Sequence, residues 1–303
     1  MEKDLVSILD LSAQEIASLF TSALEVKAGK QGGGAMQGKT LAMIFEKPSL
    51  RTRVTFETGM TQMGGHAIYL GPGDIRLGKR ESVPDVARNL SRWADGIMAR
   101  TFSHRTVVEL AKTATVPVIN ALTDREHPCQ ALACGLTLLE HRSDLKGLRM
   151  LFVGDGNNVA HSLMLMAPKV GMDFVIACPK GYEPDAEIGA QAQRLASEHG
   201  TTFEITHDPH QGVRRADVIY TDVWASMGQE EEREVRSKVF HPYQVNRELL
   251  EEAKEDCLVT HCLPAHRGEE ITDEVLDGPQ SVAFDEAENR LHVQKAIMIR
   301  LMG

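Results

Sequence analysis

Residues 47–53 place hydroxyl and cationic side chains at the start of a predicted helix. Pro48 disfavours an earlier helix start, and Ser49 is a residue type that caps helix N-termini. The first turn of a helix leaves backbone N–H groups free and carries partial positive charge, so it favours an anion. The donors gathered in this turn are Lys47, Ser49, Arg51, Thr52 and Arg53. Their density predicts an oxyanion site.

The two arginines of this turn have different expected roles. Positions two apart do not share a helix face, so we expect one of Arg51 and Arg53 to hold the anion. The other is expected to form a structural ion pair. An ordinary capped helix with a solvated basic turn is the alternative.

A second group of donors follows two later strands. Arg100 ends the apolar run 96–100, and parallel sheets bind ligands at the carboxyl ends of their strands. His127 and Gln130 are three residues apart, so they can face one side of a turn and donate to a carbonyl oxygen. An isolated His-Pro pair would more often be structural.

Three loops in the second half carry polar groups. The turn at 154–158 follows a strand and opens a helix, but Val159 stands where a dinucleotide loop needs its third glycine. A carboxylate and a hydroxyl on the loop 222–228 suit an ammonium group, although read alone this is only a surface loop. Cys262, between His261 and His266, could serve as a nucleophile or a metal ligand.

Apolar runs alternate with helical patterns along the chain. Strands are predicted at 39–45, 67–70, 96–100, 116–120, 148–153, 173–177, 202–206, 218–221, 257–260 and 281–284. Helices are predicted over 4–30 in two patches, and over 106–113, 128–141, 162–170, 184–199 and 285–301. This rhythm predicts an α/β fold of two domains, each with a parallel β-sheet flanked by helices.

Composition restricts the class of protein. The chain has 303 residues with a net charge of -10, which argues against a nucleic-acid partner. Five cysteines without a Cys-x-x-Cys pair favour reduced thiols in a cytoplasmic protein. No apolar run approaches the roughly 20 residues of a membrane span, so no membrane partner is expected.

The motifs carry a family resemblance. Residues 49–53 resemble the Ser-x-Arg-Thr-Arg signature of the carbamoyltransferases, whose loop holds the phosphate of carbamoyl phosphate. His-Pro-Cys-Gln at 127–130 resembles the family's carbamoyl-binding motif. Ser-Met-Gly at 226–228 is similar to the loop that separates ornithine-using members from aspartate carbamoyltransferases. The resemblance implies carbamoyl transfer from carbamoyl phosphate to the side-chain amine of L-ornithine, giving L-citrulline and phosphate, in arginine biosynthesis or the catabolic arginine deiminase pathway.

The resemblance also implies the site residues. The implied carbamoyl phosphate contacts are Ser49, Leu50, Arg51, Thr52, Arg100, His127, Gln130 and Arg290. The implied ornithine contacts are Asn158, Asp222, Ser226, Met227, Cys262 and Leu263. Arg100 and His127 would polarise the carbonyl, and Cys262 would position the amine. Carbamoyl phosphate is already activated, so no cofactor and no metal are expected, with adventitious zinc at Cys262 left open.

Domain organisation and assembly are implied in the same way. Residues 1–134 plus 283–303 would form the carbamoyl phosphate-binding domain, and residues 135–282 the ornithine-binding domain. The active site would lie in the interdomain cleft, and the final helix would pack back on the first domain. The family forms trimers, so a homotrimer or a multiple of trimers is expected.

Two positions depart from the family pattern. Leu50 replaces a frequent threonine, as in relatives that use acetylated or succinylated ornithine, and its side chain is expected to contribute only packing. Arg76 stands where many members have glutamine, and it has no assigned role. Three alternatives stay open: a carbamoyltransferase for N-acetylornithine or putrescine, a nucleotide-dependent oxidoreductase, and a non-catalytic protein that binds small anions.

Overall fold

The computed structural model describes residues 3–225 and 232–303, which divide into two compact units. The first unit comprises the chain up to Leu136 together with Glu288–Gly303, and the second comprises Thr137–Ala287. Helices α5 (Pro128–Arg142) and α12 (Ala283–Met302) each contribute residues to both units. Most of the final helix therefore belongs to the first unit.

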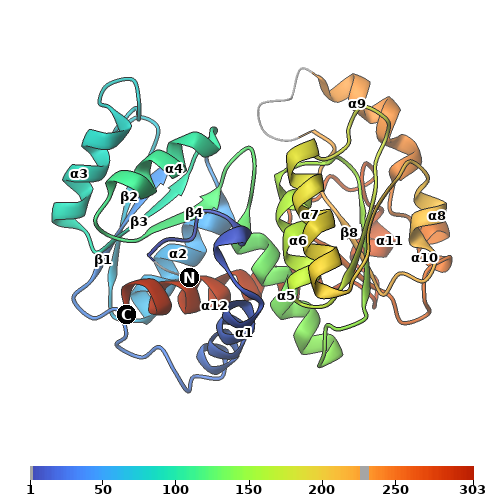
Figure 1. Cartoon of the computed structure of the whole chain (residues 1–303), viewed down its shortest axis with the longest axis horizontal. Coiled ribbons are helices and arrows are strands. Elements are labelled where there is room, and N and C mark those ends of the chain that lie inside the picture. Colours follow the sequence, from blue (N-terminus) through green and yellow to red (C-terminus); the bar gives the residue numbers. More distant parts are fainter. Residues whose placement is uncertain (1–2, 226–231) are drawn as a thin grey trace. The chain divides into compact units, whose positions relative to one another are not determined.

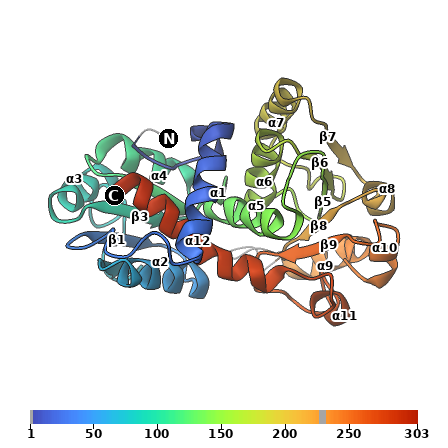
Figure 2. The same ribbon diagram turned by 90° about the horizontal axis from the view of Figure 1, so that it is seen from below.

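The first unit is built on a four-stranded parallel sheet in the order β2-β1-β3-β4. Figure 2 shows α3 and α4 on one side of these strands and α2 on the other. Its elements are η1 (Ile8–Asp10), α1 (Ala13–Lys27), β1 (Thr40–Phe45), α2 (Leu50–Gln62), β2 (His66–Leu70), α3 (Val83–Trp93), β3 (Gly96–Arg100), α4 (His104–Thr113) and β4 (Val118–Leu122).

The second unit has a five-stranded parallel sheet in the order β7-β6-β5-β8-β9. Figure 1 shows α6 and α7 on one side of it and α8, α10 and α11 on the other. Its elements are β5 (Arg149–Val153), α6 (Asn158–Lys169), β6 (Asp173–Ala177), α7 (Ala186–His199), β7 (Phe203–Thr206), α8 (Pro209–Val213), β8 (Val218–Thr221), α9 (Arg233–Phe240), η3 (His241–Tyr243), α10 (Arg247–Glu251), β9 (Leu258–His261) and α11 (Asp273–Leu276).

The central strands of both sheets are buried on both faces, which explains their sequence pattern. The last five residues of β1 and all five of β3 are buried, as are the last four of β5. Helices that cover two faces of a parallel sheet require such continuous apolar strands. The predicted fold class is confirmed. Within the described residues, no helix has the length and apolar character to cross a bilayer.

Two predicted elements are wrong. Residues 4–11 do not form an α-helix, because Leu5 pairs with Ile119 in a parallel bridge and only Ile8–Asp10 are helical, as a 3-10 turn. Residues 281–284 are not a strand either. Ser281 makes a single bridge to Val259, and α12 already begins at Ala283. In the first segment a long-range backbone pairing replaces the helix that the local pattern favours, and in the second the start of α12 reduces the strand to one bridge.

Candidate functional site

The carboxyl edge of the first sheet gathers the predicted anion-binding residues. Strands β1, β3 and β4 are neighbours, and their carboxyl ends lead to Ser49, Arg100 and His127 respectively. In parallel strands these ends lie at the same edge of the sheet, where ligands bind. Ser49 and Arg100 are about 50 residues apart in the sequence, and Arg100 and His127 are 27 apart. They lie at one edge of the sheet because their strands are neighbours.

The start of α2 is a capped helix N-terminus. The Oγ atom of Ser49 accepts a hydrogen bond from the backbone N–H of Thr52 at 3.2 Å, which confirms Ser49 as the N-cap. The Thr52 side chain is buried, and its Oγ1 atom accepts from Arg100 Nη1 at 3.5 Å and from Arg290 Nη2 at 3.2 Å. One hydroxyl thus links two guanidinium groups from β3 and α12.

Arg290 is part of this cluster rather than a surface ion pair. It is 2% exposed and donates through Nη1 to the side-chain oxygen of Gln130. With its amide oriented to satisfy both neighbours, Gln294 accepts from Arg290 Nε at 3.2 Å and donates to Thr55 Oγ1 at 2.6 Å. These contacts fix the plane of the guanidinium group.

His127 is a neutral imidazole. Burial lowers its pKa well below the ordinary value, and the charges of Arg290, Arg100 and Arg51 lower the pKa further. Because the charge of Arg51 is one of those that act on His127, Arg51 lies near the His127 ring. A neutral ring keeps one N–H donor over the physiological pH range, which suits contact with a carbonyl oxygen.

The remaining residues of this turn have other roles. Arg53 forms an ion pair with Glu57 at 2.9 Å and lies over the ring of Tyr69, which confirms that one of the two arginines is structural. Lys47 lies over the ring of Phe102 at 4.5 Å. The side chain of Leu50 is 73% exposed, so it packs little against the rest of this chain.

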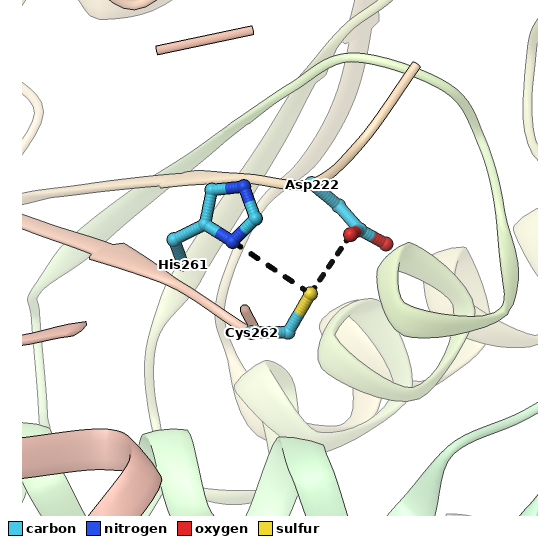
Figure 3. A group of neighbouring side chains, drawn as sticks. All are labelled: Asp222, His261 and Cys262. Atoms are coloured by element: carbon cyan, nitrogen blue, oxygen red, sulfur yellow. Dashed lines mark hydrogen bonds between the residues drawn. The ribbon is translucent and has the colours of Figure 1, made fainter. Parts of the chain in front are cut away.

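The carboxyl edge of the second sheet gathers a second group. Strands β5, β8 and β9 are neighbours, and they lead to Asn157, Asp222 and Cys262. The buried carboxylate of Asp222 accepts a hydrogen bond from Asn157 Nδ2 at 2.7 Å. It also accepts one from the backbone N–H of the next residue, Val223, at 2.8 Å. The thiol of Cys262 donates to the same carboxylate at 2.8 Å, as Figure 3 shows.

His261 lies beside this thiol but is held elsewhere. Its Nδ1 atom is 4.0 Å from the sulfur and accepts from the backbone N–H of Leu263 at 2.8 Å. Its Nε2 atom is 3.1 Å from the buried Glu270 carboxylate. The ring therefore serves to fix the loop rather than to activate the thiol. Asp222, His261 and Cys262 could hold a metal ion, which would have to displace these hydrogen bonds.

A buried ion pair lies next to this group. Arg236 donates to Asp155 Oδ2 at 2.8 Å and to the Trp224 carbonyl oxygen at 2.9 Å. Burial raises the pKa of Asp155, Arg236 opposes the shift, and the charge of Asp222 adds to it. Read from the sequence alone, the charge-rich run 230–238 predicts a solvated helix face or loop. That prediction is wrong at Arg236, which is buried.

The predicted ornithine residues are only partly described. Asn158 and Leu263 lie in the same group of loops as Asp222 and Cys262, whereas Ser226 and Met227 lie outside the described residues. Sequence reasoning missed Asn157, which caps α6 through Val159 and Ala160 and also orients Asp222. An asparagine between a strand and a helix is itself a cap signal that could have found it.

Comparison with known proteins agrees with this arrangement. Residues 3–140 match the carbamoyl-P binding domain of aspartate/ornithine carbamoyltransferases, and residues 146–301 match their Asp/Orn binding domain. An ornithine carbamoyltransferase of Thermococcus kodakarensis is 53% identical over 99% of this chain and 96% of its own length. The solved ornithine carbamoyltransferase of Pyrococcus furiosus has a TM-score of 0.96 and 53% identity, covering 99% of this chain and 97% of that one. A solved N-acetyl-L-ornithine transcarbamylase is 33% identical with a TM-score of 0.89, covering 99% of each chain. The chain belongs to the aspartate/ornithine carbamoyltransferase family.

Proposed function

We propose that this protein transfers the carbamoyl group of carbamoyl phosphate to the side-chain amine of L-ornithine, giving L-citrulline and phosphate. The observation that carries the proposal is the convergence of Arg100 and Arg290 on Thr52 and Gln130, beside a neutral His127 that also feels the charge of Arg51. Three cations beside a neutral donor suit a ligand that combines a dianion with a carbonyl group.

The first unit is proposed to bind carbamoyl phosphate. Ser49, Arg51 and Thr52 would hold the phosphate with the backbone N–H groups of α2, as would the backbone of Leu50. Arg100, His127, Gln130 and Arg290 would surround the carbonyl oxygen, where negative charge develops during attack. Arg290 donates to Gln130 and to Thr52, and Arg100 donates to the same Thr52 hydroxyl. These bonds hold the guanidinium groups and the amide in place before the reaction, so little reorganisation is needed in the transition state.

The second unit is proposed to bind ornithine. Asn158, Asp222, Ser226 and Met227 would orient the amino acid, with Cys262 and Leu263 next to the attacking amine. The nitrogen lone pair of the neutral amine forms the new C–N bond, the C–O bond to phosphate breaks, and the amine releases a proton. The Cys262 thiol donates to Asp222, so the structure supports a positioning role for it rather than a nucleophilic one.

The proposed enzyme has two substrate-binding domains and assembles as a homotrimer or a multiple of trimers. Residues 1–134 plus 283–303 would form the carbamoyl phosphate-binding domain, and residues 135–282 the ornithine-binding domain of a cytoplasmic enzyme. A homotrimer is supported by exposed apolar side chains at Leu50 and Val54 on α2 and at Ile68 on the edge strand β2.

The test is citrulline formation measured from pH 6 to 9, with ornithine well below its KM. Each pH unit below the amine pKa of about 10.4 lowers the neutral fraction about tenfold, so kcat/KM for ornithine is expected to rise about tenfold per unit. His127 adds no slope above pH 6.5, because its lowered pKa keeps it neutral there. A flat profile would rule out attack by the neutral amine. If no citrulline forms at any pH, the proposed function is wrong.

A further inference from the structure

Glu126, the residue before His127, has a buried carboxylate that turns toward the start of the chain. It is 1% exposed, and its Oε1 atom accepts from the hydroxyl of Ser7 at 2.5 Å. Its Oε2 atom accepts from the backbone N–H of Ile8 at 3.0 Å. A buried carboxylate costs free energy unless such donors satisfy it, so these two contacts determine where the side chain lies.

The backbone of Glu126 is fixed as well. Its N–H donates to Thr123 Oγ1 at 3.2 Å, and its carbonyl oxygen accepts from the Thr123 N–H at 2.9 Å. The next carbonyl oxygen, that of His127, accepts from the N–H of Gln130 at 3.0 Å, where α5 begins. The turn between β4 and α5 is therefore fixed both by the side chain of Glu126 and by backbone hydrogen bonds on either side of it.

The segment that binds Glu126 is itself anchored to β4. The N–H of Leu5 donates to the Val118 carbonyl oxygen at 2.9 Å, and the Asn120 N–H donates to the Leu5 carbonyl oxygen at 2.7 Å. Ser7 also belongs to a capping box with Asp10, which fixes the orientation of its hydroxyl. Residues 4–10 thus tie the last strand of the sheet to the turn that follows it.

We propose that Ser7 and Glu126 are positioning residues, through which residues 4–10 set the place of the His127 ring during carbamoyl transfer. The inference rests on the proposed function. Glu126 is assigned a geometric role, because its carboxylate is held by the Ser7 hydroxyl and by the backbone N–H of Ile8. A catalytic group displaced by about 1 Å can lose up to about 100-fold in rate.

The test compares Ser7→Ala and Glu126→Gln with Ser12→Ala. Ser12 is a matched control, because it also caps a helix through a capping box but bonds to Glu15 instead of Glu126. We expect Ser7→Ala and Glu126→Gln to lower kcat about tenfold or more, with KM for carbamoyl phosphate within about twofold of wild type. Ser7→Thr, which keeps the hydroxyl, is expected to retain most of the activity, and Ser12→Ala all of it.

A second readout does not depend on activity. In protein labelled with ¹⁵N at its 12 histidines, the ring signals of His127, assigned with His127→Gln, are expected to move in Ser7→Ala and to stay in place in Ser12→Ala. Unchanged kcat and unchanged ring signals in Ser7→Ala and Glu126→Gln would overturn the inference, as would equal losses in Ser12→Ala. If the wild type makes no citrulline, the proposed function fails, and the ring signals alone then decide whether residues 4–10 position His127.

Discussion

Arg51→Ala is expected to lower kcat/KM for carbamoyl phosphate by about 10²–10³-fold, the loss typical for one donor that stabilises charge in a transition state. The side chain lies in the first turn of α2, and the N-terminal turn of a helix carries partial positive charge that favours an anion. The charge of Arg51 is among those that act on His127, so the guanidinium group lies on the same side of the first unit as the proposed carbonyl donors. Steady-state kinetics with varied carbamoyl phosphate measures the effect.

Arg53→Ala is the matched control for this variant. It removes the same charge two residues along the same helix, from a side chain that pairs with Glu57 and covers Tyr69. Both variants introduce the residue with the best helix propensity, so the free energy of unfolding should change by less than about 1 kcal/mol. Near-normal kinetics in Arg51→Ala, or equal losses in both variants, would show that Arg51 does not hold the phosphate.

Asp222→Asn is expected to lower kcat/KM for ornithine by about 10²–10³-fold, while KM for carbamoyl phosphate stays within about twofold. The carboxylate accepts hydrogen bonds from Asn157, Val223 and Cys262. An amide has only one accepting oxygen and removes the negative charge, so both the orientation of Cys262 and the attraction for an amino group are lost.

Asp185→Asn provides the control in the same unit. This aspartate caps α7 by accepting from the N–H groups of Glu187 and Ile188, and asparagine caps a helix about as well as aspartate. Wild-type kinetics are expected there. Should Asp222→Asn change KM for both substrates equally, its role would be to maintain the fold rather than to bind ornithine.

The β1–α2 junction could be predicted because its determinants are local. Pro48 and Ser49 fix the helix start by their own chemistry, and the buried strand before them reads as a continuous apolar run. The neighbouring strands that bring Arg100 and His127 to the same edge follow from general rules for parallel sheets.

The errors concern contacts between residues far apart in the chain. Leu5 and Ile8 have helical spacing, but Leu5 pairs with β4 instead. Arg236 stands in a run of charges, yet Asp155 and the Trp224 carbonyl oxygen hold it in the interior. A local pattern contains no information about such partners, so neither outcome could be read from the sequence.

The substrate assignment is tested most directly by one comparison of amines. Purified protein with carbamoyl phosphate is given L-ornithine, N-acetyl-L-ornithine, putrescine or L-aspartate, and the ureido product is measured colorimetrically at one pH. The account predicts that kcat/KM for ornithine exceeds that for each other amine by at least about 100-fold, because each of the three lacks or blocks a group that the second unit would recognise. A higher value for any of the other three would contradict it.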